Sequence, residues 1–224
     1  QKDITFIGQL LKDFPLLLKH VPFDIASRRA ITEVALSADG AALQHAHVSE
    51  RDDDFLVELA TKIDAASLKY ASSRLLSNTQ FLLHLVETRG PHILAHAHAS
   101  VRSDAAWIIR VAKSGTPKAV IRHAHPSVYA TATTSEIGEM YVLHPHHVAE
   151  CLAQHSTRLS NSDFVLALRK YAHHAASDAD AVVSFASRTI LNDPNFWTRL
   201  IKTEFTFPIK NVWSYMPAIL MPDA

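Results

Sequence analysis

A pattern of large apolar residues recurs about every 25 residues and constrains this sequence more than any other feature. The pattern is anchored at seven positions: Phe6, Ile31, Phe55, Phe81, Trp107, Phe164 and Phe196. The first four intervals are 25, 24, 26 and 26 residues, and two longer intervals follow. After an anchor such as Phe55, further apolar residues follow at Leu56, Leu59 and Ala60. This spacing predicts short helices that each bury one stripe.

Small polar residues stand three positions before most of these anchors. They are Asp3, Asp52, Asn78, Asp104, Asn161 and Asp193. Asp and Asn side chains accept hydrogen bonds from the free amides of a helix's first turn, so we expect N-caps or first-turn acids here. The Ile31 segment departs from the pattern, and Ser27 is its expected cap.

A second, shorter helix is predicted before each anchor helix. Its signature is an apolar residue, any residue, a planar ring and then usually a small residue, as in Leu68-Lys69-Tyr70-Ala71. The ring positions are His20, His45, Tyr70, His96, His123, His155 and Phe185. We interpret them as one structural position, a ring packed between adjacent units.

Together these helices predict an all-α fold, a solenoid-like array of about seven short helical hairpins with a period near 25 residues. The array covers residues 1–204 as a single domain, and each hairpin is expected to bury its anchor. Residues 116–145 form an irregular insertion, because Pro126 ends a helix early and no aromatic anchor follows. Ile137 is the best substitute anchor there.

The stretch "PHILAHAHAS" (91–100) places His92, His96 and His98 close together and raises the question of a metal site. However, Tyr70 and Phe185 occupy the ring position elsewhere, and neither could replace a zinc-binding imidazole. Residues two apart on a helix also point about 200° apart. We therefore predict packing rings, not ligands.

The best candidate metal ligands lie in "LHPHHVAE" (143–150). His146 and Glu150 share a helix face at i, i+4, and His144 could approach from the loop. An alternative function is therefore a metal- or ligand-binding helical domain centred on residues 123–150. Cys151, the only cysteine, lies at an apolar helical position and is expected to be a buried structural thiol.

The C-terminal segment, residues 205–224, is rich in aromatic residues and proline and cannot form one long helix. We expect it to cap the last hairpin or to dock on a partner. Its candidate docking residues are Phe205, Phe207, Trp213, Tyr215, Met216 and Leu220.

The charge balance argues against several function classes. Lys and Arg total 22, as do Asp and Glu, so no nucleic-acid partner is expected. Arginines recur near the predicted inter-helix turns, at Arg28, Arg29, Arg51, Arg74, Arg102 and Arg122. Acids lie beside most of them, so a mixed-charge rim is the expected arrangement, with RNA binding as an alternative.

Two further classes are disfavoured by the sequence. No apolar run reaches the roughly 18 residues of a membrane span. Five glycines and no nucleophile motif predict no cofactor and no enzymatic activity. The sequence begins at Gln1 without a recognisable signal, so we expect a reducing compartment or an organelle interior, after removal of any targeting segment.

The stretch "LKYASSRLLSNTQFLLHLVETRG" (68–90) resembles the helical repeat of domain-of-unknown-function family 4116. The matching residues are Leu68, Tyr70, Ala71, Ser72, Asn78, Phe81, Leu82, Val86 and Gly90. The resemblance implies a helical repeat fold used for interaction, and it implies no chemistry. We therefore expect a non-enzymatic protein–protein interaction scaffold, an accessory structural subunit of a multi-subunit assembly.

Overall fold

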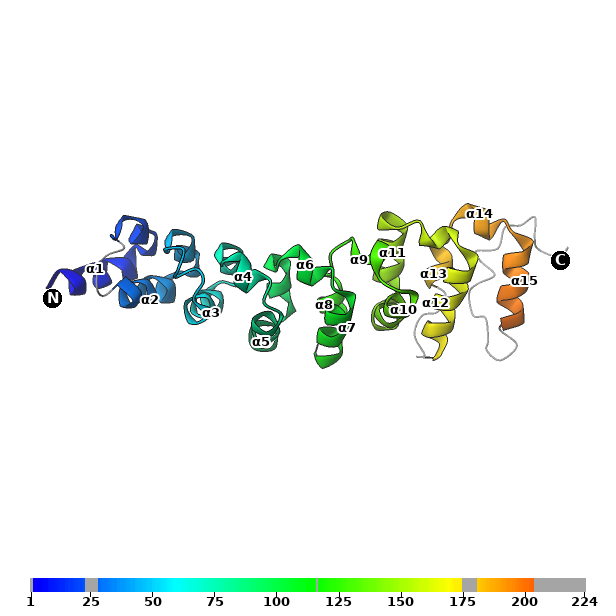
Figure 1. The fold of residues 1–224 in the computed structure, drawn as a ribbon, viewed down its shortest axis with the longest axis horizontal. Coiled ribbons are helices and arrows are strands. Elements are labelled where there is room, and N and C mark those ends of the chain that lie inside the picture. Colours follow the sequence, from blue (N-terminus) through cyan, green and yellow to red (C-terminus); the bar gives the residue numbers. More distant parts are fainter. Residues whose placement is uncertain (1, 23–27, 116, 175–180, 204–224) are drawn as a thin grey trace. The chain divides into compact units, whose positions relative to one another are not determined.

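The computed structural model describes residues 2–22, 28–115, 117–174 and 181–203 (Figure 1). About 80% of the described residues are helical, in twenty helices, and none of them belongs to a strand. The prediction of an all-α fold is therefore confirmed. None of the described helices is long and apolar enough to cross a membrane.

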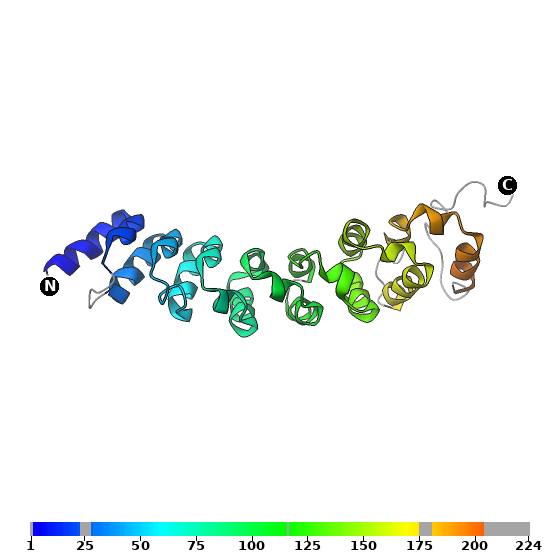
Figure 2. The ribbon, with the colours of Figure 1, turned by 45° about the horizontal axis from the view of Figure 1, so that its top comes forward.

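The chain divides into two compact units, residues 1–102 and 103–224. The sequence did not predict this boundary, which falls inside the expected array. Figures 1 and 2 show unit 1 in blue to green. The described residues of unit 1 contain ten helices. They are α1 (Lys2–Asp13), η1 (Pro15–His20), α2 (Arg28–Ala38), η2 (Gly40–His45), α3 (Asp54–Ile63), η3 (Ala65–Tyr70), α4 (Ser73–Leu76), α5 (Thr79–Arg89), η4 (Pro91–His96) and α6 (Ala99–Arg102), where η denotes a 3₁₀ helix.

Unit 2 contains the remaining ten helices. They are α7 (Ala105–Ser114), α8 (Pro117–Ile121), α9 (Val128–Thr131), α10 (Thr134–Leu143), α11 (Pro145–His155), η5 (Arg158–Ser160), α12 (Ser162–His174), α13 (Ala181–Ser184), α14 (Arg188–Leu191) and α15 (Pro194–Thr203). The region predicted to be an irregular insertion is thus helical for most of its length. Ile137 is fully buried on α10, as expected of an anchor.

The predicted short helices are present in unit 1, and they are 3₁₀ helices. His20, His45, Tyr70 and His96 are each the last residue of a six-residue 3₁₀ helix. After the last three, an alanine amide donates to the carbonyl of the leucine three residues earlier, at 2.9–3.2 Å. His123 in unit 2 precedes the same bond, from Ala124 to Ile121. These ring positions are therefore locally equivalent.

Most anchor helices are capped as predicted. The side-chain oxygens of Asn78, Asp104 and Asn161 accept a hydrogen bond from the amide three residues later, at 3.0–3.2 Å. Asp193 accepts one from the amide of Asn195. The predicted caps Asp3 and Ser27 have side chains that lie outside the described part of the chain.

The cap of α3 is Asp53, not Asp52. The Asp53 carboxylate accepts from the Leu56 amide at 3.1 Å, so Leu56 takes the buried anchor position and is 1% exposed. Phe55 lies one residue earlier, about 100° around the helix, and points outward. The prediction that Phe55 is a buried anchor is therefore wrong.

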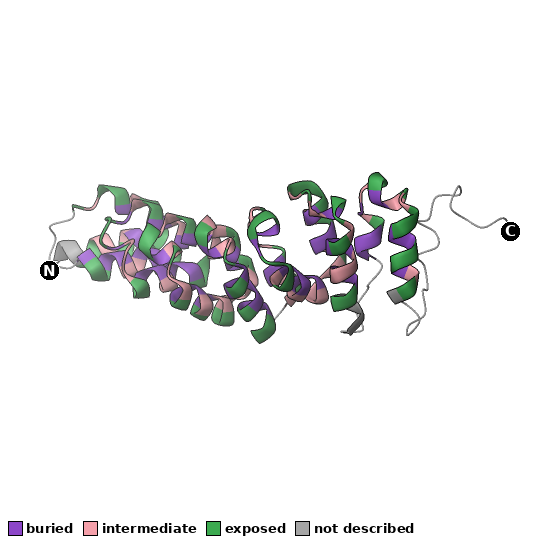
Figure 3. Cartoon of the chain, turned by 45° about the vertical axis from the view of Figure 1, so that its right-hand side comes forward, coloured by how far each residue is buried: buried purple, intermediate pink, exposed green. Residues whose placement is uncertain are grey.

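The prediction is also wrong for Phe6, which is exposed on α1. The buried position of that helix is Leu11, which is 1% exposed. The other anchors, Ile31, Phe81, Trp107, Phe164 and Phe196, are buried as expected. Figure 3 shows buried and exposed residues on the same helices, as expected of helices that each bury one side.

Candidate functional site

The candidate metal ligands do not come together as predicted. His144 is half-buried at the junction of α10 and α11, whereas His146 and Glu150 lie on the exposed face of α11. His144 instead approaches His147, with 5.3 Å between ring centroids. Among the described residues, no group of three or more His, Cys, Asp or Glu side chains is placed to hold a metal ion.

His147 faces Cys151 one helical turn later, with 3.6 Å between Nε2 and Sγ. Burial, and next the neighbouring charge of His147, lowers the pKa of His144, and burial lowers that of His147. Burial raises the pKa of the Cys151 thiol, which favours its neutral form. This cluster therefore consists of neutral groups in a partly desolvated position, consistent with the predicted structural thiol.

The second histidine of each His-Ala-His triplet has a role that the sequence analysis missed. Nδ1 of His47, His98 and His125 lies 2.8–2.9 Å from the hydroxyl of the serine two residues later. The same Nδ1 accepts that serine's amide at 3.2–3.3 Å. Ser72, which follows Tyr70 by two residues, caps α4 from the corresponding place. Each imidazole thus closes a turn. The sequence signal that the three sites share is a His-x-Ser motif, with the serine two residues after the histidine.

The docking residues predicted in the C-terminal segment, from Phe205 to Leu220, lie outside the described residues. Exposed apolar side chains are found elsewhere, mostly in unit 1. The large hydrophobic residues that are exposed in the described part of the chain are Phe6, Phe14, Leu16, Val48, Phe55 and Ile63 in unit 1 and Tyr171 in unit 2. Sequence reasoning treated Phe6 and Phe55 as core, so it missed this surface.

One of these residues, Phe55, adjoins a groove of about 310 Å³ in unit 1 through its contact with the lining residue Arg29. We call it the Phe55 groove. Its lining residues are Arg28, Arg29, Ser49, Glu50, Asp53 and Leu56. Val48 precedes one lining residue, and Phe55 lies between two others, with the Arg29 guanidinium 5.8 Å from its ring centroid.

The inner wall of the Phe55 groove is a buried ion pair. Arg28 and Glu50 are 3.3 Å apart, and each is almost fully buried. Glu50 also accepts hydrogen bonds from Thr32 at 2.7 Å and from the His47 amide at 2.8 Å. Because breaking such a network leaves a buried charge uncompensated, this wall is a fixed structural element.

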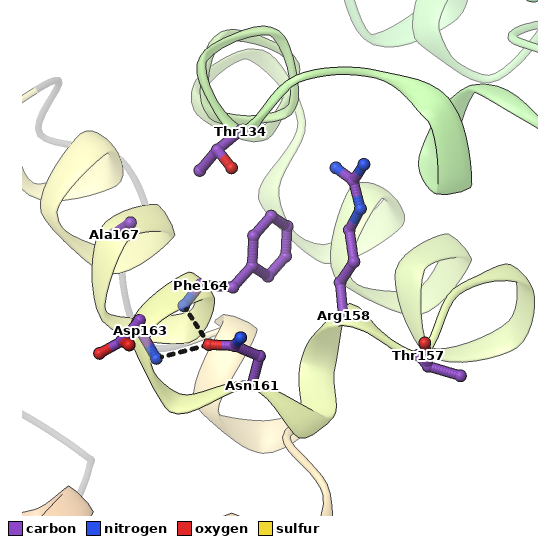
Figure 4. A pocket seen from close by; sticks show the side chains of 7 residues that line it. All are labelled: Thr134, Thr157, Arg158, Asn161, Asp163, Phe164 and Ala167. Carbon is purple, nitrogen blue, oxygen red and sulfur yellow. Dashed lines mark hydrogen bonds between the residues drawn. The ribbon is translucent and has the colours of Figure 1, made fainter.

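A second depression, of about 490 Å³, lies in unit 2 (Figure 4). The Phe164 ring occupies the space between Thr134 and Arg158, and the Asn161 amide oxygen accepts from two amides of α12. The Arg158 guanidinium lies 5.5 Å from the Phe164 ring centroid and donates to the Ala130 carbonyl at 2.8 Å. These polar groups are engaged in holding helix ends.

The predicted mixed-charge rim is present at three of its arginines. Arg28 pairs with Glu50, Arg29 with Asp53 and Glu33, and Arg74 with Asp52 and Asp54. No protein-family model, curated protein or solved structure matches this chain. The resemblance to family 4116 therefore stays a prediction.

Proposed function

We propose that this chain is a non-enzymatic protein–protein interaction scaffold and an accessory structural subunit of a larger assembly. The observation that carries the proposal is the outward placement of large apolar side chains in unit 1. Phe6 is 68% exposed, Val48 63% and Phe14 59%. Contiguous exposed apolar surface typically marks interaction sites, because leaving it in water is unfavourable.

Two of the exposed residues are eight positions apart, at α1 and directly after it. Phe6 lies on α1, Phe14 follows its last residue, and the half-buried Leu10 lies midway between them, so the three residues follow one side of the helix. A partner helix laid along such a stripe would bury it in the way that amphipathic helices dock in grooves.

We further propose that the helices form a solenoid-like array with a period near 25 residues. In unit 1, contacts run in sequence from α1 to α2, α3 and α5, and from η1 to η2, η3 and η4. Nearest-neighbour stacking of this kind supports an array, and arrays present extended surfaces to partners.

Native mass spectrometry of the chain isolated from cell extract tests the interaction proposal. We expect a stoichiometric complex that is lost when Phe6 and Phe14 are both changed to Ser. Gln9→Ser, an exposed polar position on the same helix, is the matched control and should retain the complex. A wild-type chain recovered as a clean monomer would contradict the proposal.

The alternative is a metal- or ligand-binding domain centred on residues 123–150, with His144, His146 and Glu150 as its candidate ligands. Zinc analysis of the purified chain tests it. Stoichiometric zinc that is lost in His144→Ala would favour this alternative over the scaffold.

A further inference from the structure

The four charged residues that line the Phe55 groove, Arg28, Arg29, Glu50 and Asp53, balance in charge. The acidic surplus lies beside the groove, at Glu33, Asp52 and Asp54, and we call these carboxylates with their arginine partners the rim. The Arg29 guanidinium pairs with both Asp53 and Glu33, and 3.3 Å separates its Nε from the Glu33 carboxylate. Arg74 is likewise shared between Asp52 and Asp54, at 2.9 and 3.0 Å. Each guanidinium faces two carboxylates, so each trio leaves one negative charge uncompensated.

The charged form of Asp52 is favoured. Hydrogen bonds from Ser72, and next from Arg74, lower the pKa of Asp52. Asp54, the outermost member, has 59% of its side chain exposed. Counting Arg51, which lies beside this run, the rim remains net negative by one charge.

The apolar part of the same surface is equally accessible. Phe55 is 55% exposed, and Val48 is exposed next to the lining residue Ser49. The surface thus combines two apolar side chains, a groove lined by Leu56 and an acidic rim. Arg29 contacts both the Phe55 ring and Asp53, and Arg74 pairs with Asp54 on the rim.

We infer that the Phe55 groove docks a segment of a partner protein in which apolar side chains are flanked by Lys or Arg. The apolar side chains would cover Phe55 and Val48, and the flanking cations would pair with the uncompensated carboxylates. An acidic segment would meet like charge at the rim and is excluded by the same contacts. This inference rests on the proposed interaction function and specifies its partner.

Fluorescence anisotropy of the full chain with labelled peptides tests the inference. The probe is Lys-Lys-Gly-Leu-Phe-Gly-Lys-Lys, and its controls carry Glu for every Lys or Ser for Leu and Phe. We expect the probe to bind about tenfold more tightly than either control. Its affinity should fall as salt rises from about 50 to about 300 mM, because rim charges are screened.

Variants of the chain locate the binding. Phe55→Ala should weaken the probe about tenfold, and Asp54→Asn about threefold, because each removes one rim component. Ile63→Ala is the matched control, since Ile63 is exposed on the same helix outside the groove, and it should bind the probe normally. Circular dichroism confirms that each variant folds.

Three outcomes would overturn the inference: equal affinity for the Lys and Glu peptides, equal losses in Phe55→Ala and Ile63→Ala, or self-association through Phe55 in sedimentation. The last would make a second copy the occupant. Failure of the proposed function looks different, because the wild-type chain would then be monomeric in extract whatever the peptides do. If the wild-type chain forms a complex in extract but binds the Lys and Glu peptides equally, the proposed function stands and only the inference about the Phe55 groove is refuted.

Discussion

The two units use their aromatic residues in opposite ways. In unit 1, Phe6, Phe14 and Phe55 are exposed and Phe81 is buried. In unit 2, the buried aromatic residues are Trp107, Tyr129, Tyr141, Phe164, Phe196 and Trp197. Among the described residues, unit 2 therefore places most of its large rings in its own core and exposes Tyr171, whereas the core of unit 1 is mainly leucine and three of its phenylalanine rings face solvent. The two units are both built from short helices, and they differ in whether their aromatic side chains are buried or exposed to solvent.

Alanine substitution should separate the units most strongly. Trp107→Ala removes a buried side chain and should lower the free energy of unfolding by about 3–5 kcal/mol. Phe55→Ala removes an exposed ring and should lower it by less than about 0.5 kcal/mol. Urea denaturation followed by circular dichroism measures both, and similar losses would refute the contrast.

Glycine packing should give the next largest effect. A Cβ at Gly40 would lie 2.4 Å from the Ala60 carbonyl oxygen, so Gly40→Ala should cost about 3 kcal/mol because backbone must move. At Gly138 the Cβ would meet the Tyr171 ring, a side chain that is partly exposed and can turn aside. Gly138→Ala should therefore cost less in the same urea experiment. The reverse order would show that unit 1 is the more tolerant of the two.

The capping histidines predict a smaller effect that is similar in the two units. His98→Ala in unit 1 and His125→Ala in unit 2 each remove the acceptor for a serine amide, and each should cost about 1 kcal/mol. His98→Ser should recover most of the loss, because Ser72 caps the corresponding turn in unit 1. Thermal unfolding of the three variants tests this, and a neutral His98→Ala would argue against a capping role.

Acid should have the smallest effect, and it should fall more on unit 2. The pKa values of His144 and His147 in unit 2 and of His96 in unit 1 are lowered, in each case mainly by burial. The unfolded state therefore binds these protons more readily, so stability is complete above the usual value of about 6.5 and falls as the pH drops below it. Chemical denaturation at several pH values measures the slope. A His144→Gln, His147→Gln variant should flatten it more than His96→Gln.

The helices and most caps could be predicted from the sequence because both depend on local spacing. Asn78, Asp104 and Asn161 have Ser or Thr beside them but no adjacent Asp or Asn, and the spacing of three residues to the anchor selected the correct cap. At residues 52–54 three aspartates are adjacent, and composition does not say which one begins the helix. A shift of one residue there reversed the prediction for Phe55.

Other features depend on tertiary contacts that spacing does not encode. Six-residue helices contain too few turns to distinguish i, i+3 from i, i+4 bonding, so their 3₁₀ character was not predicted. The approach of His144 to His147 is by contrast local, because His144 is the N-cap residue of α11 and His147 follows three residues later; the sequence analysis grouped His144 with His146 and Glu150 instead. The boundary after Arg102 has no compositional mark.

The turn geometry at His47, His98 and His125 has a chemical consequence. An imidazole nitrogen can receive an amide hydrogen only while it keeps its lone pair, and protonation turns that nitrogen into a donor. Three turns in this chain, which begin at His47, His98 and His125, are therefore closed by a side chain whose ability to accept an amide hydrogen depends on its charge state. The uncharged hydroxyl of Ser72 accepts the Leu75 amide whatever the pH.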